Sequence, residues 1–567
     1  MMEMTDPIGE SAWSVTVQSV EEVPDAEPER RAVTFDVTWE LEQVDVPWTY
    51  VTSAELELVD EQWQVDWSPA LLHPDLAAGD QLVLHRLSAE RAEVLDGDGA
   101  PLVTERPVYR IGIDKTRVAP DAQSTSAQQL AELVGVDAER FAERVASAGD
   151  EAFVEAITFR EADAADVLDD VDDIEGARAL EDTMLLAPTR TFARPILGTA
   201  GEATAEIIEE SEGRVQQGDV VGLSGIQLGY DETLAGNAGV RVDIQRPDGD
   251  PVTVYEQEPT AGEPVTTTFD VDLQVAAERV LADVAPPSAI VAIEPSTGHV
   301  LAAASGPGGE GYSTATLGQY APGSTFKIAT TLALLRAGLG PDDAVQCPAT
   351  VTADGREFSN YSDYPSSQRG GITLRTAFAQ SCNTAFIGQR DDVPQADLAA
   401  AAAALGIGVD ADAGVPAYAG SVPAEATGTA HAAAMIGQGE VLVSPLAMAA
   451  GAASVAAGET VVPVIVAGDQ EPPLDSLSAD EGEQLAELMR AAVEDGTANA
   501  LLDVPGEPVG AKTGTAEYGT DVPPATHGWM IAIQGDLAVA VFVEDAESGS
   551  VTAGPLLEDF LRAAADS

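Results

Sequence analysis

Ser324 and Lys327 stand three residues apart in the segment STFK (324–327), directly after the tripeptide APG (321–323). The apolar spacing of the following residues, 328–335, predicts a buried helix that begins near Ser324. Side chains three residues apart share one helix face, so the lysine amine would lie beside the serine hydroxyl. Free backbone N–H groups at the helix start favour a developing oxyanion, and an unprotonated amine can take the serine proton. The pair therefore suits acyl transfer, with Ser324 as nucleophile and Lys327 as base.

The same spacing could arise from a helix-capping serine followed by a lysine that extends to solvent. Lysine is rare in this chain, however, because only Lys115, Lys327 and Lys512 occur and the other basic residues are arginines. Two of the three fall inside motifs, which favours the catalytic interpretation. To act as a base, Lys327 needs a lowered pKa, which burial and a second nearby cation would supply.

A second motif, Ser381-Cys382-Asn383, has the form S-x-N. Its hydroxyl could relay a proton, and its amide could hold both a lysine and a substrate carbonyl. Taken alone the motif is weak, because S-x-N is common in loops and helix caps.

A third motif, Lys512-Thr513-Gly514-Thr515, lies on a predicted strand, which would place residues 512 and 514 on one face and 513 and 515 on the other if the strand were flat. Lys512 would supply the cation that lowers the pKa of Lys327. Gly514 would let a substrate backbone approach, and the threonine hydroxyls could bind a terminal carboxylate. The alternative is an edge strand protected by a lysine.

The order SxxK, SxN, KTG within one domain is the signature of penicillin-binding proteins and serine β-lactamases. At these motifs the sequence resembles the class B penicillin-binding proteins, in particular those with a small cone-shaped α+β domain ahead of the pedestal, as in low-affinity resistance transpeptidases. The likeness covers nearly the whole chain and is carried by residues 63–75 (WQVDWSPALLHPD), 222–227 with 230–231, 292–303 (AIEPSTGHVLAA), 512–517 and 527–529.

The resemblance implies a multidomain α+β chain with a β-rich pedestal and a C-terminal penicillin-binding or serine β-lactamase-like fold, an antiparallel sheet flanked by helices. It implies a D,D-transpeptidase that cross-links peptidoglycan stem peptides ending in D-Ala-D-Ala through a serine acyl-enzyme and binds penicillin covalently. No metal or organic cofactor is implied. The implied catalytic residues are Ser324, Lys327, Ser381, Asn383 and Lys512, with Thr513, Gly514 and Thr515 binding substrate. The implied oxyanion hole consists of the backbone N–H groups of Ser324 and Thr515.

One segment departs from the family pattern. Where the family usually has arginine-glycine and a DRNG-like turn, residues 91–99 read RAEVLDGDG. The details of the pedestal at this place are therefore in doubt.

Three domains are predicted: a partial cone-shaped α+β domain (1–75), a pedestal or dimerisation-type domain (76–262) and a transpeptidase domain (263–567). Alternating apolar residues predict a half-buried strand at 33–41, and Trp63, Val65 and Trp67 repeat the pattern. The middle domain has a strand at 108–113 and acidic helices between 127 and 175. In the last domain we expect strands at 266–270, 289–293, 300–304, 509–515, 528–533 and 537–543, with helices at 273–284 and 556–562.

The formal charge of −69 repels nucleic acid and anionic membrane headgroups over the whole surface. No run approaches 18 apolar residues, and the opening MMEMTDPIGE is acidic. Because the substrate that the resemblance implies lies outside the plasma membrane, we expect the protein at the outer face of that membrane, held by an N-terminal anchor that this chain does not contain. The two cysteines, Cys347 and Cys382, leave open a disulfide or two buried thiols.

Two rival functions remain. A serine β-lactamase or D,D-carboxypeptidase would share the acyl-enzyme but use water as acceptor, and it would not need some 260 residues ahead of the catalytic domain. A non-catalytic β-lactam sensor or a scaffold for divisome or elongation proteins could use the same fold, although all three motifs are intact. Expected partners are stem peptides, β-lactams and proteins of cell-wall synthesis complexes.

Overall fold

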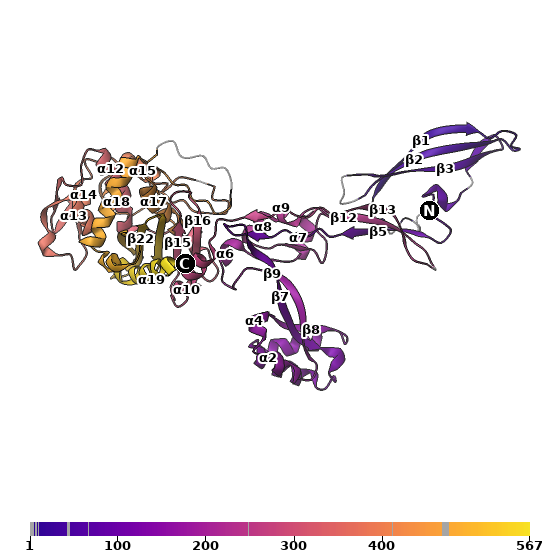
Figure 1. The fold of residues 1–567 in the computed structure, drawn as a ribbon, viewed down its shortest axis with the longest axis horizontal. Coiled ribbons are helices and arrows are strands. Elements are labelled where there is room, and N and C mark those ends of the chain that lie inside the picture. The colour runs from indigo at the N-terminus through magenta and orange to yellow at the C-terminus, as the bar shows by residue number, and fades with distance from the viewer. Residues whose placement is uncertain are drawn as a thin grey trace. The chain divides into compact units, whose positions relative to one another are not determined.

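The computed structural model describes residues 5, 8, 11–41, 46–65, 67–211, 213–247, 249–410, 412–467 and 476–566. It has two compact units, which are shown in Figure 1. One contains Met1–Glu93 and Ala200–Val265, and the other Val94–Thr199 and Thr266–Ser567. None of the helices in the described ranges is long and apolar enough to cross a membrane. Most of the acidic opening decapeptide lies outside the described residues.

The first unit contains two larger antiparallel sheets that share an apolar core, and the small antiparallel sheet β10-β11. One of the larger sheets has the order β1-β2-β3-β4 and the other β13-β12-β5. The predicted strand at 33–41 is β2, whose residues Val37 and Trp39 belong to the same buried core as Val242 of β12. The second predicted repeat is wrong in part, because β4 is exposed throughout and ends at Val65, before Trp67. The element bounds are β1 Ala12–Glu22, β2 Arg30–Glu40, β3 Trp48–Val59, β4 Gln62–Val65, β5 Gln81–Leu87, β10 Ala200–Glu202, α7 Ala205–Glu210, β11 Val220–Gly222, α8 Gly225–Gly229, α9 Asp231–Ala235, β12 Gly239–Gln245 and β13 Val252–Gln257.

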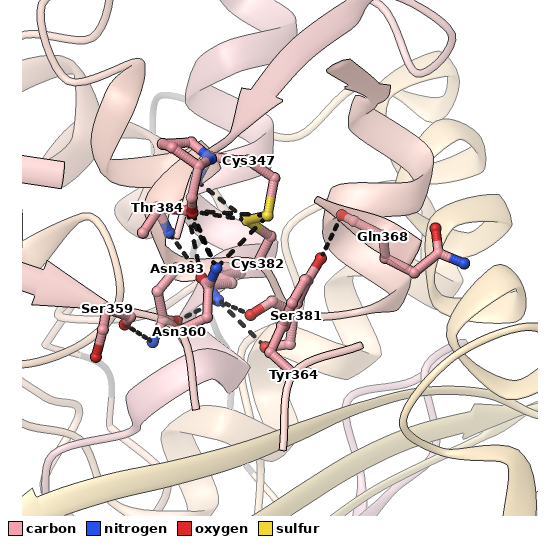
Figure 2. Close-up of a disulfide and its surroundings, with 12 residues drawn as sticks. Cys347, Ser359, Asn360, Tyr364, Gln368, Ser381, Cys382, Asn383 and Thr384 are labelled. Carbon is pink, nitrogen blue, oxygen red and sulfur yellow. Dashed lines mark hydrogen bonds between the residues drawn. A yellow bond between two sulfur atoms is a disulfide. The ribbon is translucent and has the colours of Figure 1, made fainter. Parts of the chain in front are cut away.

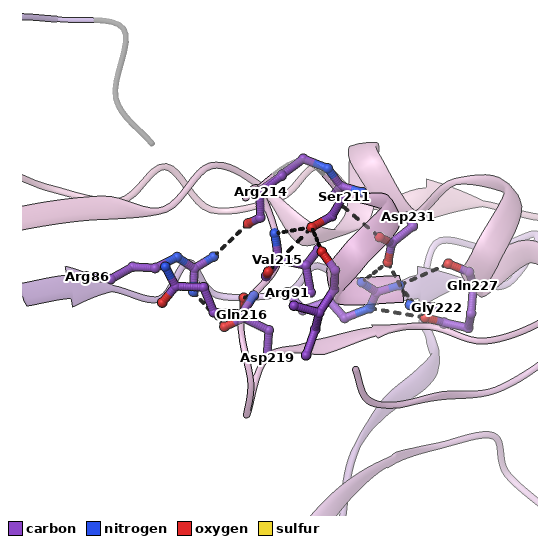
Figure 3. Close-up of polar contacts among 11 residues, drawn as sticks. Arg86, Arg91, Ser211, Arg214, Val215, Gln216, Asp219, Gly222, Gln227 and Asp231 are labelled. Atoms are coloured by element: carbon purple, nitrogen blue, oxygen red, sulfur yellow. Dashed lines mark hydrogen bonds and ion pairs between the residues drawn. The ribbon is translucent and has the colours of Figure 1, made fainter. Parts of the chain in front are cut away.

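Arg91, at the segment that departs from the family pattern, is part of a polar cluster in the first unit (Figure 3). Its guanidinium donates to Oδ1 of Asp231 at 2.7 Å and to Oε1 of Gln227 at 2.9 Å. The N–H of Gly222 donates to the same carboxylate oxygen at 2.7 Å. The arginine and the 222–231 segment therefore form one cluster, in which a buried charge is paired and hydrogen-bonded. Further along, Asp96 accepts from two backbone N–H groups and closes the turn that replaces DRNG.

The second unit begins with a small α/β part built on the long strand β7, which pairs with β6, β8 and β9. The strand predicted at 108–113 lies inside β7. The prediction of helices alone between 127 and 175 is wrong, because β8 interrupts them. The bounds are β6 Val94–Leu95, β7 Pro101–Asp114, α2 Gln123–Val134, α3 Ala138–Ser147, β8 Phe153–Arg160, α4 Glu161–Ala164, α5 Leu168–Asp172, β9 Ala177–Leu186, α6 Arg194–Leu197 and β14 Val265–Thr266.

The rest of the second unit is built on a five-stranded antiparallel sheet of order β16-β15-β23-β22-β21, flanked by helices as predicted and accompanied by two small two-stranded sheets. Its middle strands are apolar on both faces, since α10 and α19 pack on the side of Ile290 and Val541 while α17 packs against β15, β22 and β23. The sheet bounds are β15 Ser288–Ile293, β16 Val300–Ser305, β21 Gly510–Tyr518, β22 Ala525–Gln534 and β23 Leu537–Val543. The helix bounds are α10 Val271–Leu281, α11 Thr314–Leu317, α12 Lys327–Arg336, α13 Leu374–Ala379, α14 Asn383–Gly388, α15 Gln395–Ala404, α16 Gly428–Ala434, α17 Pro445–Ala457, α18 Ala479–Glu494 and α19 Gly554–Asp566.

The strand predicted at 266–270 is wrong, because β14 ends at Thr266. Asp270 instead caps α10, with its carboxylate accepting from the N–H of Leu273 at 2.8 Å. Helix α10 consequently begins two residues before the predicted start and ends at Leu281. The predicted hairpin between β22 and β23 is present, with the two strands pairing from Gly528 to Gln534.

Candidate active site

Ser324 lies in the 3-10 turn η5 (Gly323–Phe326), directly before α12. The helix proper therefore begins three residues later than predicted, at Lys327. The hydroxyl of Thr325 donates to the carbonyl of Pro322 at 2.7 Å and closes this tighter turn. Lys327, one turn after Ser324, is completely buried.

Strand β21 lies directly against the Ser324 turn. Gly323 has a φ of +54°, and a Cβ there would lie 2.6 Å from the carbonyl oxygen of Thr515. A Cβ at Gly514 would likewise lie 2.8 Å from the carbonyl oxygen of Pro322. On the other side, the N–H of Gly323 donates to the carbonyl of Gly437 at 2.8 Å. Glycines therefore permit an approach of three backbone segments that any side chain would prevent.

Lys327 Nζ has three hydrogen-bond acceptors, all from the S-x-N motif. It donates to Oδ1 of Asn383 at 2.8 Å, to the carbonyl of Ser381 at 3.0 Å and to the hydroxyl of Ser381 at 3.2 Å. The ring of Phe386 lies 5.1 Å from the amine. Burial, and secondly the charge of Lys512, lower the pKa of Lys327 well below its usual value. The environment therefore favours the neutral amine that a general base requires.

Lys512 reaches the same hydroxyl from β21. Its Nζ donates to Oγ of Ser381 at 3.0 Å and to the carbonyl of Thr513 at 2.9 Å. The side chain is fully buried, and burial lowers the pKa of Lys512 to about 7. When two lysine amines converge on one hydroxyl, protonating both is unfavourable, because like charges repel strongly in a buried site. The charge of Lys512 lowers the pKa of Lys327 in addition to burial, so Lys512 is the lysine that loses its proton at the higher pH.

The S-x-N turn has an unusual backbone. Ser381 has a φ of +55°, which is rare for a residue with a side chain, and Asn383 opens α14. Cys382, between them, forms a disulfide with Cys347 (Figure 2). The amide of Asn383 also donates through Nδ2 to the carbonyl of Ser359 at 3.3 Å, so both ends of this amide are bound.

Each threonine of the third motif lies in β21 and makes a contact through its hydroxyl. The hydroxyl of Thr513 is 2.7 Å from the hydroxyl of Thr497, and the hydroxyl of Thr515 accepts from the N–H of Gly549 at 3.1 Å. Because the Thr515 oxygen acts as acceptor in that bond, its proton remains available to an anionic ligand. Thr497, Ser359 and the cystine were not identified from the sequence as parts of this site, since no motif marks them.

Family models match three consecutive segments. A penicillin-binding protein transpeptidase domain model matches residues 288–562, a penicillin-binding protein dimerisation domain model matches 86–267, and an NTF2-like N-terminal transpeptidase domain model matches 4–80.

Two curated relatives illustrate the likeness in sequence. The peptidoglycan D,D-transpeptidase PbpA of Mycobacterium tuberculosis is 33% identical over 328 residues, which are 48% of this chain and 65% of that protein. This match therefore spans just under two thirds of the relative's length. Penicillin-binding protein 3 of Bacillus subtilis is 22% identical over 538 residues, which are 86% of this chain and 78% of that protein.

Two solved structures share the fold. Penicillin-binding protein PBP2 of Helicobacter pylori, in its complex with MreC, has a TM-score of 0.63 at 18% identity and covers 85% of this chain and 98% of its own. A chain of a peptidoglycan synthase complex that coordinates polymerisation and cross-linking has a TM-score of 0.65 at 25% identity, covering 86% of this chain and 92% of its own.

Proposed function

The chain belongs to the penicillin-binding protein family, with the architecture of its class B, and we propose that it is a peptidoglycan D,D-transpeptidase. One observation carries this proposal: the hydroxyl of Ser381 lies between two amines, 3.2 Å from Nζ of Lys327 and 3.0 Å from Nζ of Lys512. Such an arrangement can move a proton between a nucleophile and a leaving amine. Burying a lysine amine costs free energy because the amine loses its hydration. A non-catalytic protein with this fold would have no need to bury two of them.

In the proposed reaction, Ser324 Oγ attacks the carbonyl carbon of the penultimate D-alanine, and neutral Lys327 takes the hydroxyl proton. The proton passes through Ser381 to the terminal D-alanine, which leaves as the amine. An acceptor amine then attacks the acyl-enzyme and loses its proton to the same base, and Ser324 recovers its hydroxyl. The new amide is the cross-link. Penicillin would stop at the acyl stage because its ring-opened leaving group stays attached.

Substrate recognition in this proposal uses the carboxylate of the terminal D-alanine. Lys512 contributes the charge, and the hydroxyls of Thr513 and Thr515 donate hydrogen bonds. The test is covalent labelling by a fluorescent penicillin, followed by incubation of a D-Ala-D-Ala peptide with and without an acceptor amine. Formation of the amide supports a transpeptidase, whereas hydrolysis alone or rapid turnover of a chromogenic cephalosporin would favour the carboxypeptidase or β-lactamase alternative.

The cellular setting is part of the proposal. Peptidoglycan substrates lie outside the plasma membrane, so we propose that the protein works at its outer face. Because the two structural relatives come from an MreC complex and a synthase complex, we also propose that this chain acts within a cell-wall synthesis assembly.

Lys512→Ala should alter the pH dependence of acylation in two ways. The charge of Lys512 lowers the pKa of Lys327, so its loss should raise that pKa and move the acidic limb of the profile to higher pH. The alkaline limb, which in the parent reflects Lys512 losing its proton above about pH 7, should disappear. Acylation rates measured from pH 5 to 10 check both effects, and an unshifted acidic limb would contradict the electrostatic role.

Thr515→Pro should reduce acylation severely, by about 10²- to 10³-fold, because proline removes the backbone donor assigned to the oxyanion hole. Thr515→Val is the matched control, since it loses the hydroxyl but keeps the N–H, and it should retain far more activity. Equal losses in the two variants would argue against a backbone donor at residue 515. Circular dichroism and thermal melts check that both variants are folded.

A further inference from the structure

We propose that Asn360 and the Cys347–Cys382 disulfide hold the segment 348–360 against the start of α14, and that this segment orients Asn383 for catalysis. The inference rests on the proposed function, because the reaction it modulates is acylation of Ser324. It concerns positioning residues, none of which touches the reacting atoms.

The orientation of the Asn383 amide depends on a carbonyl outside the three motifs. Oδ1 accepts from Lys327 at 2.8 Å, and Nδ2 donates to the carbonyl of Ser359 at 3.3 Å. An amide has one acceptor end and one donor end, so a fixed acceptor for Nδ2 determines which end faces the lysine. If Ser359 moved away, the amide could rotate and present an N–H group to Lys327.

Ser359 ends a hairpin that has little support of its own. Strands β18 (Thr350–Ala353) and β19 (Arg356–Ser359) form a separate two-stranded sheet. An isolated hairpin is at best marginally stable in water, so its position depends on contacts with the rest of the unit. At its tip, the hydroxyl of Thr429 donates to the carbonyl of Ala353 at 3.2 Å, and further polar contacts lie at its two ends.

Both ends of the hairpin are attached to Thr384, the residue after Asn383 (Figure 2). At the first end, the hydroxyl of Thr384 donates to the carbonyl of Pro348 at 2.7 Å. At the second end, Oδ1 of Asn360 accepts from the N–H of Thr384 at 3.0 Å, and Nδ2 of Asn360 lies 3.2 Å from the Thr384 hydroxyl. Nδ2 also donates to the carbonyl of Pro348 at 3.3 Å, which joins the two ends to each other.

The disulfide adds a covalent attachment at the same place. Cys347 precedes Pro348, and Cys382 precedes Asn383, so the bond joins the start of the segment to the middle of the S-x-N motif. Both cysteines have an exposed fraction of 0%. Reduction needs an attacking thiolate to reach a sulfur, so the burial favours a permanent attachment over a redox switch.

The test compares acylation rates with a fluorescent penicillin. Asn360→Ala should slow acylation by about tenfold to a hundredfold, the scale expected for a displacement near 1 Å. Ser362→Ala, an exposed neighbour in the same loop, should leave the rate unchanged. The double variant Cys347→Ala, Cys382→Ser removes the disulfide and should slow acylation similarly. Serine is chosen at position 382 because its hydroxyl can keep the helix cap that Cys382 provides to the N–H of Ala385.

A general loosening of the site is distinguished by coupling to Asn383. In the Asn383→Ala background, adding Asn360→Ala should cause no further loss, because the proposed route through the amide is already removed. If Asn360→Ala does not fold, two variants of Thr384 test the same attachment. Thr384→Ser keeps the hydroxyl and should acylate at the parent rate, whereas Thr384→Val loses the hydroxyl and should acylate more slowly. Folding is checked by thermal melts.

The outcomes separate the two proposals. A parent protein that penicillin does not label would overturn the proposed function itself. A parent that labels, together with folded Asn360→Ala or Thr384→Val variants that label at the parent rate, would overturn only the positioning role. A full additional loss in the Asn383→Ala background would overturn it too.

Discussion

Replacing Ser324 by alanine should abolish covalent labelling by penicillin and leave the fold intact. The hydroxyl of this residue is the proposed nucleophile, and without it no acyl-enzyme can form. The surrounding turn does not depend on that hydroxyl. It is held by the bond from Thr325 to the carbonyl of Pro322 and by the indole N–H of Trp529, which donates to the carbonyl of Ala321 at 2.9 Å.

The measurement is a gel of the fluorescent adduct together with intact-protein mass. The mass of the parent should increase by one penicillin, and that of Ser324→Ala should not change. Ser366→Ala, an exposed serine of the same unit, is the control and should label normally. A folded Ser324→Ala protein that still gains the adduct would end the assignment of Ser324 as nucleophile.

The three motifs could be recognised in the sequence because each needs particular residue types at short spacing, and their catalytic roles stay predictions. Lysine scarcity strengthened the case for Lys327 and Lys512, and the structure brings both amines to the hydroxyl of Ser381. The α+β architecture with an antiparallel catalytic sheet was likewise predicted correctly. Local patterns of this kind are read within a few residues and need no knowledge of distant contacts.

Features that depend on distant contacts could not be predicted. The sequence left the pairing of Cys347 and Cys382 open, because a separation of 35 residues does not determine a distance. The contact between Thr497 and Thr513 was missed for the same reason. Arg91 and Asp231 were each noticed, yet nothing in either segment indicates that a buried ion pair joins them.

Some predicted helices and strands were wrong because local interactions or weak patterns outweighed the hydrophobic periodicity of the sequence. Asp270 reads as the end of a strand in the sequence, but its carboxylate caps α10 and turns the chain into a helix. Strand β8 was missed because Val154 is its one buried residue, so the strand lacks a clear alternation of buried and exposed side chains.

Lys327→Ala should slow acylation by about 10²- to 10⁴-fold, the usual contribution of a positioned general base. The loss should fall on the rate of the chemical step and leave penicillin affinity nearly unchanged, because carboxylate recognition is assigned to Lys512 and the threonines. Rapid-mixing measurements over a range of penicillin concentrations separate the two quantities.

Two variants distinguish a base from a mere positive charge. Lys327→Arg keeps a cation that cannot lose its proton, so it should be as slow as the alanine variant. Lys115→Ala removes the third lysine, which donates to the carbonyls of Val145 and Ala148 at the end of α3. It should lower thermal stability but not the acylation rate of the folded protein. Fast acylation by Lys327→Arg would show that the residue serves as a charge, and the proton acceptor would then have to be another group.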